Sequence, residues 1–348
     1  MPRVLLRSLL ALVVAAGAVL IGWRVLAPAE VLSAATTPYP AAVDRAPGVV
    51  GRTNMAPLIV DGRIRVYAAK RQVRADGPAD AKTVMTARWS FRRWPEQLAG
   101  VAASGRTVVS RWSDGELVAI DGRTGEIAWR ADGPEARGFD GHRTGAGTVW
   151  APPGLRVAPG VVVVSGGGDL VAYELTTGVR RWRISACADG FTTGGGHYVC
   201  PTGAVDLATG APVGSWPAGP YTPLDCATGL STCAAMLDGA GQHWSIEAAA
   251  PRRSAAPDYP DAQVLGRSNG NVVLLRPDRH LVEVDPRTGA TLAEFPLAVG
   301  TERLTWKPGR WQVTDGFVAI ERLAPDGPAD PETVGHYFTT ETVILAAL

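Results

Sequence analysis

Cysteine is the residue type with the widest chemistry in this sequence, and its four copies fall within one window, at Cys187, Cys200, Cys226 and Cys233. The N-terminal segment described below targets the chain for export, and an even number of cysteines in an exported chain favours disulfides. We expect Cys187 to pair with Cys200 and Cys226 with Cys233, because each pair would join the first two strands of a repeat unit. A metal or redox site is disfavoured, since the separations of 13 (200 − 187) and 7 (233 − 226) residues contain no CxxC motif and no paired histidines lie nearby.

The other residue types that could hold a metal are dispersed along the chain. The histidines form no HxH or HxxxH pair, and we expect structural or surface roles for His142, His197, His243, His280 and His336. Calcium needs clustered oxygen ligands, whereas the acidic loop residues are spread over the repeat units: Asp114, Asp140, Asp169, Asp189, Asp225 and Asp238. The sequence therefore predicts no metal site and identifies no catalytic residue.

Two further features have ordinary explanations. The glycine triplets at 166–168 and 194–196 neither follow a strand and open a helix nor carry the Lys-Ser/Thr of a phosphate-binding loop, so they are predicted to be hairpin turns. The 34 basic and 33 acidic side chains give a net charge of +1. Nothing in this balance indicates the basic face that a nucleic-acid partner would need.

The elements that position these residues are defined by an internal repeat. Leu117–Trp129 (LVAIDGRTGEIAW) predicts a strand, a tight turn and a second strand, and the phrase returns at Leu170–Trp182, Ala204–Trp216 and Leu281–Phe295. The acidic residue can accept hydrogen bonds from the turn amides, the glycine supplies a positive φ, and the tryptophan carries a large apolar area to the contact between units. The repeat-motif residues are Ala119, Asp121, Thr124, Gly125, Trp129, Ala172, Glu174, Thr177, Gly178, Trp182, Ala204, Asp206, Thr209, Gly210, Trp216, Asp285, Thr288, Gly289 and Phe295.

The spacing of the repeat predicts the architecture. A degenerate copy is expected at Trp244–Ala255, with Glu247 in place of the aspartate, so that Asp121 and Asp285 span four units of 41 residues on average, (285 − 121)/4. That is the length of a four-stranded propeller blade. We therefore predict an all-β fold, a seven-bladed β-propeller with eight blades as the alternative. The C-terminal strand His336–Leu348 is expected to pair with N-terminal strands and so to protect the edges.

Turn signals predict further strands. Leu58–Tyr67 is expected to be a hairpin with its turn at Asp61-Gly62, and Ser268–Asn271 another hairpin turn. Thr83–Phe91 is predicted to be the last strand of the first blade, after a turn expanded by Val73–Lys82, and Val161–Ser165 a buried central strand.

Tryptophan is abundant, with 11 copies. Trp89, Trp129, Trp182 and Trp216 are predicted to dock one unit against the next. Trp23 belongs to the N-terminal targeting segment. Most of the remaining six are expected in the core, with some on the face of the ring, where aromatic side chains would serve a partner or a sugar: Trp94, Trp112, Trp150, Trp244, Trp306 and Trp311.

The N-terminus is a targeting segment. Residues 1–8, with Arg3 and Arg7, form a positive cytoplasmic n-region, and residues 9–26 are predicted to be a transmembrane signal anchor. A cleaved signal peptide is the alternative, because Ala27-Pro28-Ala29 fits a cleavage site. Residues 27–50 are predicted to be a Pro/Ala-rich linker and residues 51–348 the propeller. The expected location is the cell membrane, single-pass, with the propeller on the extracytoplasmic side.

The pattern A-x-D-x-x-T-G-x-x-x-W, complete at Ala119–Trp129, resembles the PQQ-like (quinoprotein-type) β-propeller repeat superfamily. That superfamily includes quinoprotein dehydrogenases and non-catalytic propellers such as the outer-membrane assembly lipoprotein of the β-barrel machinery. The dehydrogenases use a disulfide between sequence-adjacent cysteines beside the cofactor, and this chain has no Cys-Cys pair. The resemblance is therefore closest to the non-catalytic, assembly-factor-like branch, and its motif specifies blade structure rather than chemistry.

These observations predict an exported, membrane-tethered propeller that acts as a non-catalytic protein-binding or scaffolding module. Its expected partners are a protein at the cell surface or in the periplasm and, through the anchor, the membrane. No cofactor is expected. The alternatives are a PQQ-dependent dehydrogenase of alcohols or sugars, which would hold PQQ with calcium, and a carbohydrate-binding cell-surface protein.

Overall fold

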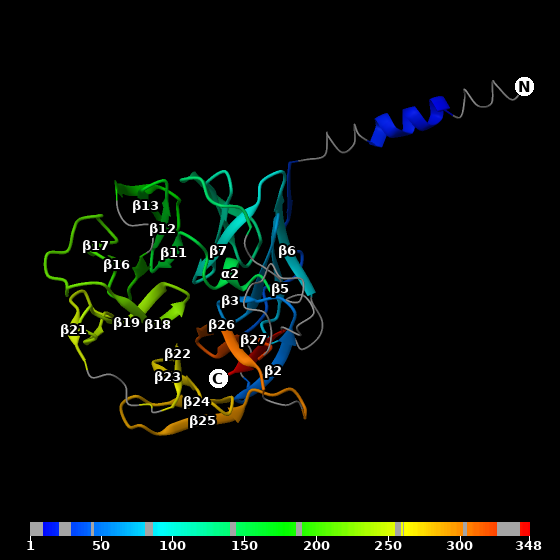
Figure 1. The fold of residues 1–348 in the computed structure, drawn as a ribbon. Coiled ribbons are helices and arrows are strands. Elements are labelled where there is room, and N and C mark those ends of the chain that lie inside the picture. The colour runs from blue at the N-terminus through cyan, green and yellow to red at the C-terminus, as the bar shows by residue number, and fades with distance from the viewer. Residues whose placement is uncertain are drawn as a thin grey trace, which may run out of the picture.

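The structure, a computed structural model, describes residues 10–20, 29–42, 45–80, 86–139, 144–185, 190–254, 259, 261–301, 305–325 and 342–348. Within these residues the chain is built almost entirely from antiparallel strands that form six hydrogen-bonded sheets. Figure 1 shows the sheets standing in chain order around a common axis. The predicted all-β fold is therefore confirmed.

The first four sheets are formed one after another along the chain. The first has the order β1-β6-β5-β4-β3, with β1 (Glu30–Ser33), β3 (Leu58–Val60), β4 (Ile64–Ala69), β5 (Gln72–Gly77) and β6 (Thr86–Arg93). The second contains β7 (Leu98–Ser104), β8 (Thr107–Trp112), β9 (Glu116–Asp121) and β10 (Ile127–Asp132). The third contains β11 (Leu155–Ala158), β12 (Val161–Gly166), β13 (Asp169–Glu174) and β14 (Arg180–Ser185). The fourth has three strands, β15 (Phe191–Thr192), β16 (His197–Cys200) and β17 (Gly203–Asp206).

The remaining strands form two sheets. One has four strands, β22 (Gln263–Ser268), β23 (Asn271–Leu275), β24 (His280–Val284) and β25 (Thr291–Pro296). The other has eight strands in two halves that a single bridge pair, Thr228 with Gln312, joins. One half contains β18 (Thr222–Thr228), β19 (Ser231–Leu237), β20 (His243–Ser245) and β21 (Arg252–Arg253). The other half contains β26 (Lys307–Thr314), β27 (Phe317–Leu323), β28 (Thr342–Ala347) and β2 (Gly48–Thr53).

The first strand of each group lies nearest the axis. Contacts run from β3 to β7, β11 and β15, then through the β18–β19 pair to β22, β26 and back to β3. At the last of these contacts the buried Gln312 side chain replaces a backbone partner: Ile59 N donates to its Oε1 (2.8 Å), and its Nε2 donates to Ile59 O (3.2 Å). A side chain thus joins the last sheet to the first.

The chain ends meet within one sheet. β28 pairs with β27 on one side and with the N-terminal strand β2 on the other, from Gly48 opposite Ala347 to Thr53 opposite Val343. This confirms the predicted pairing for Thr342–Ala347, while residues 336–341 lie outside the described residues. β2 therefore covers the edge that β28 would otherwise expose, and β2 becomes the outermost strand of the sheet.

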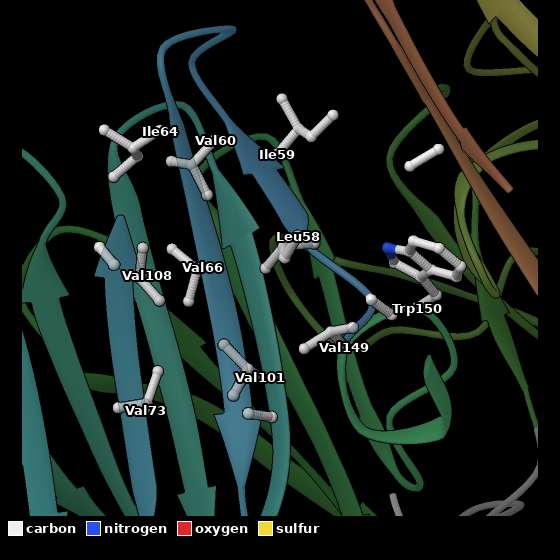
Figure 2. Close-up of a cluster of buried hydrophobic side chains, with 14 of the residues drawn as sticks. Leu58, Ile59, Val60, Ile64, Val66, Val73, Val101, Val108, Val149 and Trp150 are labelled. Carbon is white, nitrogen blue, oxygen red and sulfur yellow. The ribbon is translucent and has the colours of Figure 1, made fainter. Parts of the chain in front are cut away.

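The core lies between neighbouring sheets. Alternate residues of β4, including Ile64 and Val66, are fully buried against Val101 and Val108 of the next sheet (Figure 2). The intervening residues Arg65 and Tyr67 are buried as well, because the sheet is covered on both faces. Each fully buried aliphatic side chain contributes roughly 1.5–3 kcal/mol relative to an exposed one.

Several hairpins agree with their predicted turns. Asp61 (φ 55°) and Gly62 (φ 61°) join β3 to β4, and Asn269 (φ 50°) and Gly270 (φ 85°) join β22 to β23. Val161–Ser165 lies in β12, an interior strand of its sheet, as expected. One prediction was wrong in detail: part of the predicted turn at residues 73–82 belongs to β5, which pairs with both β4 and β6. Residues 146–149 form a one-turn helix, α2 (Ala146–Val149), between β10 and β11.

The predicted linker, residues 27–50, is partly incorporated in the fold. Glu30–Ser33 forms β1, an additional outermost strand on β6. Arg93 and Arg130 hold Glu30 by ion pairs of 2.9 and 2.6 Å. The lack of hydrophobic periodicity suggested a solvated stalk, but partners distant in the sequence supply the hydrogen bonds that fix this segment.

Residues 10–20 are helical, and the aliphatic side chains among them are exposed, with Leu10 67% and Val19 71% accessible. Among the residues the structure describes, none of the helices combines the length and apolar character needed to cross a membrane. Much of the predicted anchor, residues 9 and 21–26, falls outside those residues.

Candidate interaction site

The four repeat turns have the same backbone geometry. The glycine amide donates to the carbonyl of the acidic residue four positions earlier: Gly125 to Asp121 (2.7 Å), Gly178 to Glu174 (2.9 Å), Gly210 to Asp206 (2.8 Å) and Gly289 to Asp285 (2.8 Å). Each turn threonine also accepts, with its hydroxyl, a backbone amide two residues on. All four glycines have φ between +70° and +75°, which glycine adopts at the lowest cost. The motif therefore specifies one local structure.

Three of these turns form a tryptophan–glycine dock, in which the indole of one sheet covers the turn glycine of the next. Trp89 covers Gly125, Trp129 covers Gly178 and Trp182 covers Gly210. The indole Nε1 donates to the carbonyl three residues before that glycine, at Gly122 (3.0 Å), Leu175 (2.8 Å) and Leu207 (2.9 Å) respectively. A Cβ on any of these glycines would lie within 2.8 Å of the ring or its Cβ. The absent side chain therefore makes room for the indole.

The other two aromatic members of the motif behave differently. Trp216 contacts His197 within its own sheet, with ring centroids 5.0 Å apart, and its Nε1 has no partner among the described residues. It stands two positions later than the motif requires, and its sheet lacks a fourth strand to carry it across. Phe295 packs half-buried in another cluster, and no atom lies within 4 Å of a Cβ on Gly289. The docks therefore join only the first four sheets.

In the degenerate copy at Trp244–Ala255 the connection follows the third strand of its group of strands, as in the other copies, but it lacks the repeat turn. Glu247 lies in the connection between β20 and β21, the third and fourth strands of their half-sheet. Residues 255–258 lie outside the described residues.

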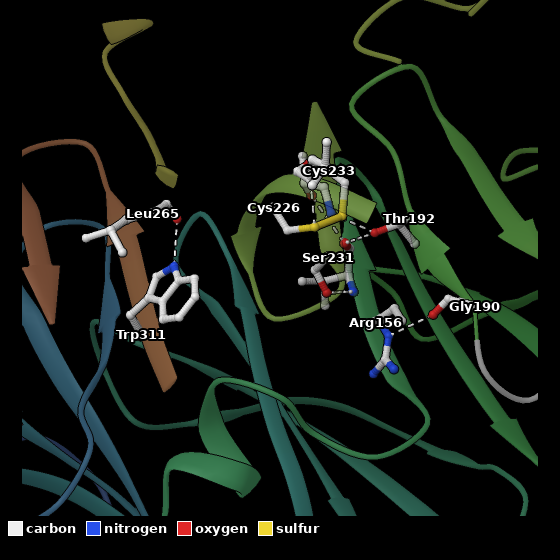
Figure 3. Close-up of a disulfide and its surroundings, with 11 residues drawn as sticks. Arg156, Gly190, Thr192, Cys226, Ser231, Cys233, Leu265 and Trp311 are labelled. Atoms are coloured by element: carbon white, nitrogen blue, oxygen red, sulfur yellow. Dashed lines mark hydrogen bonds between the residues drawn. A yellow bond between two sulfur atoms is a disulfide. The ribbon is translucent and has the colours of Figure 1, made fainter. Parts of the chain in front are cut away.

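Cys226 and Cys233 form a disulfide between paired positions of β18 and β19 (Figure 3). Cys200 is disulfide-bonded as well, but Cys187 lies outside the described residues, so the 187–200 pairing stays a prediction. Within the described residues no cysteine is free.

A cavity of 490 Å³ opens between the axial strands. Its wall combines residues of β18, β22 and β26 with the segment after α2, and is largely apolar: Leu224, Leu230, Leu265, Trp150 and Trp311. Figure 3 shows Trp311 and Leu265 on one side of this region and the disulfide on the other. Trp311 Nε1 donates to Leu265 O (2.7 Å), and Trp150 Nε1 donates to Pro57 O (2.9 Å). Both indoles are therefore held in place by neighbouring backbone. We call this region the axial cavity.

The axial cavity has one unusual acidic residue. Asp225 adopts a left-handed backbone (φ 51°) between the paired positions Leu224 and Cys226 of β18, and its side chain is 7% exposed. Burial raises the pKa of Asp225, while Arg267, whose Nε lies 4.0 Å from Oδ2, opposes that rise. A strained, buried acid in an apolar wall is a feature that sequence reasoning did not single out, since Asp225 was assigned to an ordinary loop. The backbone strain that marks it is visible only in the structure.

The other candidate residues do not converge. His197 is buried against Trp216, His243 Nδ1 lies 2.7 Å from Ser254 Oγ, and His280 pairs with Asp278. His142, His336, Asp140 and Asp189 lie outside the described residues. In the part of the chain that the structure describes, no three His, Cys, Asp or Glu side chains are grouped so that they could hold a metal.

The remaining tryptophans divide between core and surface. Trp112 and Trp306 are buried, Trp94 is 51% exposed, and Trp244 is half-buried with its Nε1 bonded to Asp238 Oδ2 (2.9 Å). Of this group, Trp150 and Trp311 line the axial cavity.

Comparison with known proteins identifies the family. A family model described as outer membrane protein assembly factor BamB matches residues 9–140 and 113–307. No curated protein sequence matches the chain significantly. Among solved structures, BamB from Moraxella catarrhalis aligns with a TM-score of 0.40 and 13% identity over 91% of this chain and 100% of that one. A crystal structure of the mitotic checkpoint complex aligns with a TM-score of 0.48 and 12% identity over 90% of this chain and 93% of that one. Because the family model covers most of the sequence, including all four repeat turns, the predicted resemblance is confirmed and the chain belongs to the BamB family of PQQ-like β-propellers.

Proposed function

We propose that this protein is a membrane-tethered, extracytoplasmic β-propeller that binds another protein and does not catalyse a reaction. The observation that carries the proposal is the axial cavity, an apolar hollow with two fixed indoles in a member of a family described as an assembly factor. Aromatic side chains in concave, largely apolar surroundings are the usual anchors of a protein interface.

We further propose that the ring has seven blades. The six sheets contain seven groups of consecutive strands when the eight-stranded sheet is divided at its single bridge pair. The fourth group has three strands, and β2 completes the last one from the N-terminal side.

The membrane tether is proposed from the N-terminal sequence. Residues 9–23 are uncharged and largely apolar, Arg24 is the one charged residue of the predicted anchor 9–26, and Arg3 and Arg7 before it favour a cytoplasmic N-terminus. The test is fractionation of cells that produce the full chain. We expect the protein in the membrane pellet after washes with salt and carbonate, and in the soluble extracytoplasmic fraction when residues 1–26 are replaced by a cleavable signal peptide. Release of the full chain by the washes alone would contradict the tether.

We propose that the protein works without a cofactor. PQQ carries three carboxylates and is held with calcium in the dehydrogenases, whereas the charged side chains on the axial cavity wall are Asp225 and Arg310. These residues do not fit that group. Titration of the purified protein with PQQ, with and without Ca²⁺, followed by calorimetry, tests this: saturable, calcium-dependent binding would favour the dehydrogenase instead.

The protein-binding proposal is tested by site-specific photo-cross-linking in the source cells. A photoreactive residue at Leu224 or Leu230, on the cavity wall, should give one discrete adduct with an extracytoplasmic protein. The same residue at Val179, which is 64% exposed on the turn between β13 and β14, is the matched control. Absence of an adduct at both cavity positions, or the same adduct at Val179, would refute binding at the axis.

A further inference from the structure

A second hollow, of 620 Å³, lies at the seam between the first two sheets, well away from the axial cavity. It is lined by Pro38, Tyr39, Asp61, Arg63, Arg106 and Arg123. The three arginines come from three separate hairpin turns: Arg63 follows the β3–β4 turn, Arg106 lies in the β7–β8 turn and Arg123 in the β9–β10 turn. We call this the arginine hollow.

The walls of the arginine hollow are fixed. Gly122 N donates to Arg106 O (2.8 Å), which joins the two turns of the second sheet. On the opposite wall the buried Arg88 donates to Pro38 O (2.8 Å) and to Thr37 O (3.0 Å), and so holds the segment that carries Tyr39. Tyr39 donates to Asp61 Oδ2 (3.4 Å) across the hollow. The arrangement is therefore built by hydrogen bonds from elements far apart in the sequence.

The charges in the arginine hollow are not balanced. Asp61 is the one carboxylate on its wall, and it lies 3.8 Å from Arg63. Arg106 and Arg123 are exposed and have no ion pair with any described residue. Asp121, next to Arg123 in the chain, uses its carboxylate to accept the backbone amide of Arg123 (2.7 Å) and is not part of the wall. Arg88 stands behind the wall, 5.7 Å from the Tyr39 ring, and adds a further positive charge.

Three other arginines at the surface are paired with a nearby acid. Arg181 pairs with Glu174, Arg183 with Asp169, and Arg276 with Glu294. Asp61 offsets one of the three positive charges, and the charges of Arg106 and Arg123 are left without a carboxylate partner among the described residues. Like charges on one wall repel one another. An anion placed between them would relieve this repulsion, and each guanidinium could bind a carboxylate with two parallel hydrogen bonds.

We propose that the arginine hollow binds an acidic peptide segment, whose successive Asp or Glu carboxylates meet Arg63, Arg106 and Arg123. The hollow is much larger than one small anion and open to the surface, and its guanidiniums stand on separate turns, which suits several carboxylates along an extended chain. The proposal rests on the proposed function of protein binding and names the chemistry of a second contact with the partner.

The test uses the full-length protein in detergent and a fluorescent poly-glutamate peptide, measured by anisotropy at low and high salt. The wild-type protein should bind the peptide, with affinity that falls as salt rises. The double variant Arg106→Gln/Arg123→Gln should lose at least about tenfold in affinity, because each charge-assisted contact is worth about that much. Both side chains are exposed, so circular dichroism and thermal midpoint should match the wild type.

Arg287→Gln is the matched control. Arg287 occupies the same position of the repeat turn as Arg123 (DPRTG against DGRTG), but its side chain is 88% exposed, and its Nε lies 3.6 Å from Asp285 Oδ1 of the same turn. It should leave peptide affinity within about twofold. Unchanged binding by the double variant, or an equal loss in Arg287→Gln, would overturn the proposal. Displacement of the peptide by inorganic phosphate at equal ionic strength would overturn the assignment to a peptide.

The outcome is separable from that of the proposed function. An adduct at the axial positions together with peptide binding that ignores the arginine variants leaves protein binding in place and refutes the arginine hollow. Peptide binding that depends on Arg106 and Arg123, without an axial adduct, supports the arginine hollow and refutes binding at the axial cavity.

Discussion

The tryptophan–glycine dock makes a prediction in which the chain supplies its own control. Gly178 and Gly289 occupy the same position of the repeat turn, with φ of +70° and +72°. A Cβ on Gly178 would lie 2.5 Å from Cε3 of Trp129, whereas a Cβ on Gly289 would meet no atom within 4 Å. Replacement of each glycine by alanine therefore changes the backbone energy equally and the packing only at Gly178.

The magnitudes follow from this difference. Alanine in the left-handed region costs roughly 1–2 kcal/mol at either position. At Gly178 the new methyl group must also displace the indole of Trp129, which is 7% exposed and donates to Leu175 O. Overpacking of a filled site costs typically about 1–3 kcal/mol more. We expect Gly289→Ala to lower the free energy of unfolding by about 1–2 kcal/mol and Gly178→Ala by about 2–5 kcal/mol.

The assay is chemical denaturation followed by far-ultraviolet circular dichroism, with the midpoint and slope of each variant compared. A third variant, Trp129→Ala, should cost about 3–5 kcal/mol, because it empties a large aromatic site. In combination with Trp129→Ala, Gly178→Ala should cost no more than Gly289→Ala, since the clash is then gone. Equal losses for the two glycine variants, or full additivity with Trp129→Ala, would refute the reasoning.

Three further predictions concern other parts of the fold. Non-reducing peptide mapping should recover a 226–233 link and a 187–200 link, and four free thiols would contradict both. Burial lowers the pKa of His197 in the folded protein, so the unfolded state binds more protons than the folded state near and below the ordinary histidine pKa of about 6.5. The thermal midpoint should therefore fall as pH drops from about 7.5 to 5. His197→Gln should flatten that dependence. Arg130 and, to a lesser degree, Arg93 lower the pKa of the Glu30 carboxyl. Glu30 therefore stabilises the folded state above the pKa that it has in the unfolded chain, and this stabilisation is lost as pH falls. Glu30→Gln should therefore speed hydrogen exchange in β1 at neutral pH, and an unchanged rate would show that the ion pairs do not hold the strand.

The sequence was sufficient for features that depend on local chemistry. The repeat turn needs only an acid, a threonine and a glycine at fixed spacing, and all four copies form the same hydrogen bonds. The hairpin turns at Asp61-Gly62 and Asn269-Gly270 were predictable for the same reason, because their residues tolerate positive φ. Trp129 was predictable as a contact between units, but the glycine beneath it, 49 residues later (178 − 129), was not.

Features that depend on distant partners were not predictable. Residues 30–40 look like a linker because they lack periodicity, yet Arg88 and Arg93 of β6 supply the hydrogen bonds and ion pairs that hold them. Trp216 has the residue type of a dock but lacks the fourth strand that would carry it to the next sheet. The axial cavity and the arginine hollow each combine segments from several turns or first strands, so their composition can be read only after the sheets are placed.

The distribution of the docks bears on where function lies. The docks join the first four sheets, whereas β18, β22 and β26, which line the axial cavity, belong to groups of strands without one. The same part of the chain departs from ordinary backbone geometry, since Asp225 (φ 51°) and Thr232 (φ 53°) are left-handed within strands. A strained residue within a strand costs of order 1–3 kcal/mol, which a structure retains where packing imposes it or where function uses it. Places where local sequence rules fail are expected to be functional or strained sites. The absence of the docks, the strain and the cavity coincide in one half of the ring, and this coincidence is the physical argument for placing the contact with the proposed partner there.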